Sequence, residues 1–482
     1  MKKKISIFGL SLFIAVNMLT GCQTSVKKEK AKKPNIILVM ADDQGWGDTG
    51  YNGHPFIKTP NLDAMAKQSV VFDRFYAAAP VCSPTRASVM TGRTPIRTNV
   101  VNHGHYMRPN EITIAEALKT ADYITGFFGK SHIGSVQKES PTCPGQFGFD
   151  EWLAGLNFFD VNPYLSRNGK FEHLKGQGTV ITMDATLEFL NKHKDDGKPI
   201  FVVSWFPAPH DPHLEKPVDF PGSDTLYNNA GKWRGYYLET TLMDQQVGRL
   251  RKALREMKIE ENTIVWFCSD NGGLNRETSG GREKKGSIYE GGLRVPGMLE
   301  WPNKFKPKHI STPATTMDIY PTLLEIVGIK MENQPKLDGM SLSALIKGAK
   351  QIHRPVGFWH NYEKGQLTYS DRIIKKLMEA QQAGEPTPFP ERILKNVKEF
   401  PKLEKGKYNG HAAWLKWPWK LHRIEKNGQV KVELYNLETD PMEANDLATL
   451  EKKRTANMLQ ELENWQASVF NSLEGKDYKN KL

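Results

Sequence analysis

Four short apolar runs, each followed directly by polar residues, constrain the fold of this chain more than any other feature. They occupy residues 35–40, 123–128, 200–206 and 263–268. Runs that are continuously apolar and rich in β-branched residues are typical of strands buried on both faces of a parallel sheet. Strands that alternate with helices fold into α/β layers, which is the fold class expected here.

Amphipathic helices are predicted in two of the intervening segments. Their apolar side chains recur at steps of three and four residues, at Val180, Met183, Leu187 and Leu190 and at Met243, Val247, Leu250, Leu254 and Met257. Open α/β sheets bind ligands at the carboxyl ends of their strands. We therefore expect the polar residues that follow the four runs to meet at one edge of the sheet.

Acidic and amide side chains follow two of the runs. Asp42 and Asp43 come after the first run, and Asp270 and Asn271 after the last. Either pair alone would favour a solvated loop rich in turn-forming residues. Together, at strand ends that can lie side by side, they favour a metal site. Their ligands are hard oxygens without sulfur or imidazole, which suits calcium or magnesium rather than zinc.

Basic residues are predicted to converge on the same edge. They are Arg86, Lys130, His132, His210 and Lys285. A divalent cation surrounded by several fixed cations suits a tetrahedral oxyanion ester and the charge that develops during its hydrolysis.

Cys82 lies in the stretch "PVCSPTRASVMTGR", where a turn-forming Ser-Pro precedes a predicted helix. A cysteine at a helix N-terminus beside an arginine is expected to be ionised and reactive. Cys268 lies inside a predicted strand and is expected to be a core residue, and Cys143 has no assignable role. With the leader removed, these three cysteines show no disulfide pattern and no paired zinc spacing.

The N-terminus resembles a bacterial lipoprotein leader. Three lysines precede an apolar run that ends in "LTGC", which predicts a signal peptide over residues 1–22 and lipidation of Cys22. An ordinary secretion signal with a chance cysteine is the alternative. Residues 23–33 form a basic tether too polar to fold. We expect a protein lipid-anchored to a bacterial membrane and facing the periplasm or the cell surface.

The net charge argues against a nucleic-acid partner. The whole chain carries +12, of which the leader lysines supply three and the tether a net four, so about +5 remains on the folded part. This mild excess is not the signature of a nucleic-acid-binding protein. Some 450 residues remain, enough for a large core and two domains.

At this point the chain resembles a known family, the type I sulfatases of the alkaline-phosphatase-like superfamily. The resemblance rests on seven blocks in family order, roughly between residues 34 and 448: "ADDQGWGD", "CSPTRASVMTGR", "TIAEALKTADYITGFFGKSHIG", "APHDPH", "SDNGG", "KKGSIYEGGLRVP" and "ELYNLETDPMEANDLA". It implies a layered, mostly parallel sheet with helices on both faces, and a smaller C-terminal subdomain of antiparallel sheet plus helix.

The resemblance also implies the chemistry of the site. A maturation enzyme would oxidise Cys82 to Cα-formylglycine, whose hydrate attacks sulfur and later expels sulfate without attack by water at sulfur. One calcium ion would be held by this residue with Asp42, Asp43, Asp270 and Asn271. Arg86 and Lys130 would hold the formylglycine, and His132 would take the proton during sulfate release. Lys285 and His210 would contact the sulfate, with His210 protonating the leaving sugar oxygen.

The second domain is predicted over residues 346–482, after a catalytic domain at 34–345. Strand-like runs flank Asn427-Gly428, a strong hairpin signal, and a helix follows with Leu459, Leu462, Trp465 and Val469 on one face. Residues 364–407 form a charged, proline-punctuated insertion. It is interpreted either as a solvated surface helix and loop or as a wall of the substrate cleft. Aromatic and basic residues that could line a sugar site are Trp359, His360, His411 and Trp414.

The function favoured by the sequence is sulfate ester hydrolysis on a sulfated oligosaccharide from an algal or host polysaccharide, with His213 and Arg282 as further substrate-binding residues. Two alternatives stay open. One is a phosphatase or phosphodiesterase of the same superfamily, which the Cys82 signature disfavours. The other is a calcium-dependent glycan-binding lipoprotein without turnover, which requires that Cys82 is never modified.

Overall fold

A ten-stranded sheet forms the centre of the computed structural model, which describes residues 32–213, 222–349, 354–397, 403–404 and 406–478. The strand order is β12-β2-β11-β9-β1-β8-β4-β5-β6-β7. The strands are β1 (Asn35–Ala41), β2 (Val70–Phe72), β4 (Ile124–Lys130), β5 (Glu151–Gly155), β6 (Tyr164–Arg167), β7 (Lys170–His173), β8 (Ile200–Trp205), β9 (Thr263–Ser269), β11 (Gly297–Glu300) and β12 (Lys308–Ile310).

The four strands predicted from the apolar runs lie next to one another in the sheet as β9-β1-β8-β4. Each neighbouring pair is parallel, and Leu38 of β1 pairs with Val203 of β8 and with Trp266 of β9. The edges are different, because β11 runs antiparallel to β9 and the β5-β6-β7 meander is antiparallel. Four strands therefore end at the same edge, as the sequence predicts.

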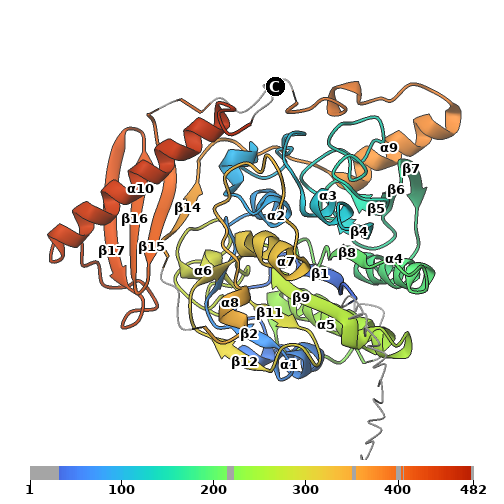
Figure 1. Ribbon diagram of the computed structural model, residues 1–482, viewed down its shortest axis with the longest axis horizontal. Helices are drawn as coiled ribbons and strands as arrows, with labels where there is room; N and C mark the ends of the chain where they lie inside the picture. Colours follow the sequence, from blue (N-terminus) through green and yellow to red (C-terminus); the bar gives the residue numbers. More distant parts are fainter. Residues whose placement is uncertain (1–31, 214–221, 350–353, 398–402, 405, 479–482) are drawn as a thin grey trace, which may run out of the picture. The chain divides into compact units, whose positions relative to one another are not determined.

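Both faces of the sheet are covered by helices (Figure 1). Along β1, Leu38 packs into one apolar core and its neighbours Ile37 and Val39 into the other, because successive side chains of a strand point to opposite faces. The core around Leu38 includes residues of α2 (Cys82–Thr91), α3 (Ile114–Lys119), α7 (Ile319–Val327), α8 (Ser343–Ile346) and α9 (Ser370–Ala383). The opposite core includes residues of α1 (Pro60–Ala66), α4 (Gly178–His193) and α5 (Arg234–Glu256).

A second, antiparallel sheet follows in the C-terminal part of the chain, with the order β14-β15-β16-β17. Its strands are β14 (Val356–His360), β15 (Gly410–Lys416), β16 (Trp419–Lys426) and β17 (Gln429–Asn436). The predicted hairpin is present, since Asn427 and Gly428 both adopt positive φ angles between the paired residues Lys426 and Gln429. The helix α10 (Lys452–Leu473) lies across this sheet and buries Leu462 and Val469 (Figure 1).

A short three-stranded sheet and a four-residue helix join the two parts. The strands β3 (Phe75–Tyr76), β10 (Arg294–Val295) and β13 (Ala314–Thr315) pair in the order β10-β3-β13, and α6 (Glu290–Leu293) precedes β10. The apolar core beside them contains Tyr76 together with Phe358 of β14. The predicted fold class, a mostly parallel layered sheet with a smaller antiparallel sheet and helix, is confirmed. The exact domain boundary stays a prediction.

Two expectations about the C-terminal part need correction. Trp359, His411 and Trp414 are buried packing residues rather than the lining of an open sugar site. The indole of Trp359, for example, donates a hydrogen bond to the Asn409 carbonyl at 3.0 Å. Within the insertion, α9 is solvated on one side only, because Ile373, Ile374 and Leu377 are buried beside β6 and β7. Its sequence is amphipathic, and the edge of the main sheet supplies the surface that buries its apolar side.

The predicted signal peptide, including Cys22, and the tether as far as residue 31 lie outside the described residues. Within the part of the chain that the structure describes, no helix is both long enough and apolar enough to cross a membrane. The lipid anchor stays a prediction.

Candidate active site

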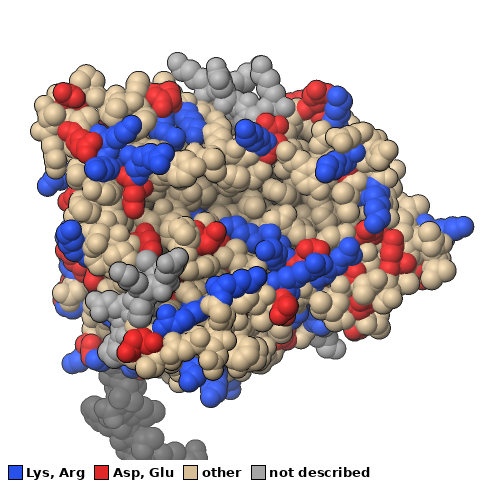
Figure 2. All heavy atoms as spheres, turned by 180° about the vertical axis from the view of Figure 1, so that it is seen from behind, with Lys and Arg blue, Asp and Glu red and all other residues tan. Residues whose placement is uncertain are grey.

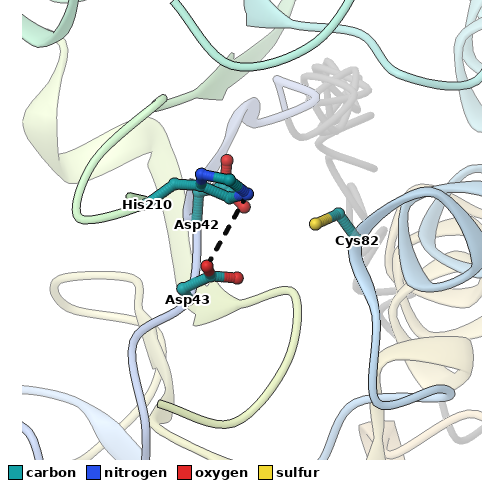
Figure 3. A group of neighbouring side chains, drawn as sticks. All are labelled: Asp42, Asp43, Cys82 and His210. Carbon is teal, nitrogen blue, oxygen red and sulfur yellow. Dashed lines mark ion pairs between the residues drawn. The ribbon is translucent and has the colours of Figure 1, made fainter. Parts of the chain in front are cut away.

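The predicted site residues gather where the parallel strands end. Asp42 and Asp43 follow β1, Asp270 and Asn271 follow β9, and His210 follows β8 by a short loop. The ligand atoms of Asp42, Asp43, Cys82 and His210 all lie within 4.8 Å of one another. Figure 3 shows the Cys82 sulfur, at the start of α2, directed toward the two aspartates and the imidazole.

Asp270 and Asn271 join this group through hydrogen bonds to Asp43. The side-chain amide of Asn271 donates to Oδ1 of Asp43 at 2.8 Å, and the backbone N–H of Asp43 donates to Oδ1 of Asp270 at 3.2 Å. Asp43 itself has a φ angle of 73°, a conformation that few residues other than glycine adopt. The strand ends therefore bring four predicted oxygen ligands and the cysteine together.

Three cations neutralise the three carboxylates. Lys130 Nζ lies 2.6 Å from Oδ2 of Asp42, and Lys285 Nζ lies 2.6 Å from Oδ2 of Asp43. Arg86 donates through Nε and Nη2 to Oδ2 of Asp270, at 3.0 and 2.7 Å. All six side chains are buried except for Lys285, whose side chain is 21% exposed. The protein groups alone thus balance near zero charge.

The residues present fit a hard divalent cation. Oδ1 of Asp42 and Oδ1 of Asn271 are buried and have no hydrogen-bond partner among the described residues. Arg86 Nη2 lies 3.5 Å from Oδ1 of Asp42, whereas leaving Oδ1 of Asn271 without any contact is costly. These two atoms, with the carboxylates of Asp43 and Asp270, form an oxygen-rich donor set of the kind that calcium prefers. The ion itself is not part of this structure.

The surroundings shift the pKa values of two of the carboxyl groups in opposite directions. Burial opposes ionisation of Asp42, but Lys130 and its other cationic neighbours outweigh it and hold the pKa of Asp42 well below its usual range. Burial and the Asp42 charge, in contrast, raise the pKa of Asp270 to about 7 despite the contact with Arg86. Of these two carboxyl groups, Asp270 is therefore the one whose ionisation is opposed by its surroundings.

One expectation about Cys82 is wrong for the unmodified side chain. A helix N-terminus and a nearby arginine predict an ionised thiol, but burial raises the pKa of Cys82 to about 12. Lys130 and Lys285 act in the opposite direction and are not sufficient. The guanidinium of Arg86 is paired with Asp270, with 2.7 Å between Nη2 and Oδ2. An unmodified thiol is therefore a poor nucleophile here.

Of the two histidines of the site, His132 is buried and His210 is partly exposed. His132 has a φ angle of 58°, and neither of its ring nitrogens has a hydrogen-bond partner among the described residues. Burial, with Lys130 and Arg86, places its pKa well below the usual value. His210 lies stacked on the ring of Phe158, with 5.0 Å between centroids, and its Nε2 is 3.8 Å from Asp43.

The two predicted substrate-binding residues lie in different surroundings. His213 contacts the ring of Tyr236, whose hydroxyl oxygen lies 2.9 Å from the Asp43 carbonyl oxygen. Arg282, which the sequence predicts to bind substrate, is engaged by contacts outside the group around Cys82. Its guanidinium stacks on Tyr289 and donates to the hydroxyl of Tyr435 at 3.0 Å, so it is engaged by the C-terminal sheet.

The loop that carries Lys285 is held by a buried network from the C-terminal sheet. Lys420 of β16 lies 2.8 Å from Glu290 and 3.1 Å from Glu443, and all three side chains are at most 5% exposed. Glu443 also accepts a hydrogen bond from the Glu290 backbone N–H at 2.7 Å. On the other side of the loop, the N–H of Gly286 donates to the Pro80 carbonyl at 2.9 Å. The C-terminal part thereby helps to fix the position of Lys285.

Sequence reasoning missed several residues around the site. Asp48 accepts a hydrogen bond from the Tyr236 hydroxyl at 2.6 Å and from the Gly45 backbone at 2.9 Å, so it shapes the loop that carries Asp43. Asp48 stands in the block "ADDQGWGD", so this motif could have identified it as a residue of the site. Phe158, which stacks on His210, follows β5 at a point where no motif marks it.

Comparison with known proteins identifies relatives along most of the chain. The family model described as Sulfatase matches residues 34–329. The ulvan-active sulfatase of Formosa agariphila is 31% identical over 370 residues, which span 72% of this chain and 72% of that protein. N-acetylgalactosamine-6-sulfatase of Homo sapiens is 30% identical over 370 residues, or 68% of each chain.

Solved structures agree with these matches. The crystal structure of Ps i-CgsB is 27% identical in sequence and gives a TM-score of 0.73, covering 90% of this chain and 93% of that chain. The same protein has been crystallised in complex with k-i-k-neocarrahexaose.

Proposed function

The chain belongs to the sulfatase family and is a sulfuric ester hydrolase, and we propose that it removes sulfate from a sulfated carbohydrate with one calcium ion and a formylglycine made from Cys82. The observation that carries this proposal is the convergence of Cys82, three carboxylates and three cations where the parallel strands end. Membership of the family favours this activity over a phosphatase and over a glycan-binding protein without turnover.

The charge of the site supports an anionic substrate. The three carboxylates and three cations balance, so a bound divalent ion gives the site a net positive charge of about two. A sulfate ester carries one negative charge, and the same excess favours the additional charge that develops on the ester oxygens during cleavage. Figure 2 shows a hollow in the middle of one face of the molecule, with Lys and Arg side chains in a row along its lower side.

The modified residue and the metal would lie side by side. Asp42, Asp43, Asp270 and Asn271 would hold the calcium ion together with the side chain at position 82. When present, the hydrated aldehyde supplies a hydroxyl nucleophile and the ion withdraws charge from sulfate oxygens. Modification would also replace the buried thiol of Cys82, which burial favours in its protonated form, with a group that supplies a nucleophile.

The remaining side chains orient the reactants and move protons. Lys285 is proposed to contact the sulfate, and Arg86 and Lys130 to hold the residue at position 82. His132, kept neutral by burial and by its cationic neighbours, is proposed to accept a proton as sulfate is released. His210 is proposed to protonate the leaving sugar oxygen. Its stacking on Phe158 fixes the plane of the imidazole for this role.

The carbohydrate substrate is proposed from the relatives. Their names refer to ulvan and to N-acetylgalactosamine 6-sulfate, and one related structure contains a carrageenan-type hexasaccharide. The leader supports a lipid anchor at Cys22 and a location outside the cytoplasm, where sulfated polymers and their fragments are met. A formylglycine-generating enzyme is the implied maturation partner.

The proposal is tested by measuring sulfate release. Protein co-expressed with a formylglycine-generating enzyme is incubated with ulvan fragments, carrageenan oligosaccharides, N-acetylgalactosamine 6-sulfate and p-nitrophenyl sulfate. Release from at least one carbohydrate, abolished by Cys82→Ala, is expected. Turnover of p-nitrophenyl sulfate alone would contradict the carbohydrate assignment and leave the sulfatase activity intact.

A further inference from the structure

Two segments that contact each other, one of them next to the first turn of α2, take no part in the chemistry described above. They are the loop 102–105 and the segment 361–369, which we call together the site wall. The N–H of Gly104 donates to the hydroxyl of Ser83 at 2.9 Å, and Ser83 directly follows Cys82 in α2. The loop 102–105 therefore packs against the first turn of the helix that carries the nucleophile position.

The two segments of the site wall hold each other in place. The side-chain amide of Asn102 donates to the Glu363 carbonyl at 2.7 Å, and the N–H of Gln366 donates to the His103 carbonyl at 2.8 Å. A Cβ added to Gly365 would come within 2.1 Å of the His103 ring. The imidazole therefore rests directly on the Gly365 backbone, which limits the orientations that it can take.

His103 presents one ring nitrogen without a partner. Oδ1 of Asn102 lies 3.1 Å from Nδ1 of His103, and Nε2 has no hydrogen-bond partner among the described residues. The Asn102 oxygen can only accept, so Nδ1 carries the proton and Nε2 of the neutral ring is an acceptor. Burial, then Lys285 and Lys130, lower the pKa of His103 and keep the ring neutral. Nε2 is thus suited to accept a hydrogen bond from a hydroxyl group.

Exposed apolar side chains are concentrated in the same wall. Tyr362, Leu367 and Tyr369 are 47%, 71% and 56% exposed. Single exposed apolar residues need no explanation, but three within eight residues are typical of a surface that binds something. Tyr362 makes an edge contact with His360, whose lowered pKa is due to burial and to His103. Tyr362 also lines a hollow of about 520 Å³ that continues to the hairpin turn at 425–428.

We propose that the site wall is a sugar-binding subsite of the active site, and that it serves an oligosaccharide rather than a small sulfate ester. Nε2 of His103 accepts a hydrogen bond from a hydroxyl of the sugar that carries the sulfate. The ring of Tyr362 packs against the next sugar, whose apolar C–H face matches an exposed tyrosine. The hollow beyond Tyr362 accommodates further sugars. This inference rests on the proposed function and specifies its substrate as a chain of sugars.

The test measures the ratio of kcat/KM for the best sulfated oligosaccharide of the panel described above to kcat/KM for p-nitrophenyl sulfate. Tyr362→Ala and His103→Asn are each expected to lower this ratio by about tenfold, the effect of losing one ring contact or hydrogen bond. His103→Asn keeps an N–H near the Nδ1 position but has no atom at Nε2. His103→Gln places its side-chain amide near the position of the missing Nε2 atom, so its ratio is expected to lie between that of His103→Asn and that of the wild type. Gly365→Ala, which displaces the ring, is expected to lower it.

The control is Leu450→Ala, which truncates a side chain that is 79% exposed outside the site wall, and its ratio is expected to match the wild type. The inference is overturned if the ratio for Tyr362→Ala and His103→Asn equals that of the control while the wild type cleaves an oligosaccharide. If only p-nitrophenyl sulfate is cleaved, the carbohydrate part of the proposed function fails and this inference fails with it.

Discussion

Replacing Lys420 with methionine leaves two buried carboxylates without the ammonium group that both contact. Glu290 and Glu443 lie 2.8 and 3.1 Å from its Nζ, and their side chains are 5% and 0% exposed. Removing one partner of a buried ion pair costs about 3–5 kcal/mol. Here the two carboxylates lose their shared ammonium group, although Glu443 keeps the contact with His422 Nε2 at 2.7 Å. We expect a loss of this size in the free energy of unfolding, measured by urea titration of the wild type and the variant.

The loss should depend on pH in a defined direction. Burial already raises the pKa of Glu443 with Lys420 present, and removal of Lys420 raises it further. A carboxyl group whose pKa is higher in the folded than in the unfolded state lowers the free energy of unfolding when it is ionised. This destabilisation is complete at a pH above the folded-state pKa and disappears at a pH below the unfolded-state pKa. The difference between variant and wild type should therefore be larger at about pH 8 than at about pH 5.

Lys416→Met is the matched control. Lys416, at the end of the neighbouring strand β15, lies 2.8 Å from Glu461 of α10. Its side chain is 54% exposed, so its loss should cost less than about 1 kcal/mol. Because Glu290 belongs to the loop that carries Lys285, Lys420→Met should also lower kcat, whereas Lys416→Met should not. Equal effects of the two substitutions on stability would refute the reasoning.

Three further predictions concern the site itself. Calcium added at about 100 times its dissociation constant should stabilise the protein by about 2.7 kcal/mol, and Asp43→Asn should weaken this response; a melting temperature that is the same with calcium and after stripping with a chelator would contradict the metal site. His210→Gln should slow sulfate release from a sugar far more than from p-nitrophenyl sulfate, whose leaving group needs no protonation; equal slowing would contradict its role as the acid. Raising the salt concentration should lower kcat/KM for a sulfated oligosaccharide more than for p-nitrophenyl sulfate, because charges on remote sugars are screened over about 8 Å; identical salt dependence would argue against the positive site.

The main sheet and the site could be predicted because both follow from local patterns. The central strands β1 and β9 are buried along their whole length and apolar along most of it, since both faces of the sheet are covered, and the polar residues directly after them must lie at the sheet edge. Asp42 and Asp270 therefore meet although more than 200 residues separate them. The hairpin at Asn427 was equally local, because two positive φ angles select this residue pair.

Other features depend on tertiary contacts that leave no local signal. The protonated state of Cys82 is set by complete burial, which the helix-terminal position does not reveal. Arg282 stands close in sequence to Lys285, yet Tyr289 and Tyr435 draw it to the C-terminal sheet. His103 stands outside the motifs that identified the site, and its place became evident only from the contact between Gly104 and Ser83.

The most direct test of the account is the mass of the peptide that spans residues 75–86, isolated from active protein. The proposed mechanism requires conversion of Cys82, so the peptide should carry an aldehyde in place of the thiol and react with a hydrazide probe. The fraction converted should rise in proportion to kcat when a formylglycine-generating enzyme is co-expressed. A fully active preparation that contains only the unmodified thiol at position 82 would contradict the account.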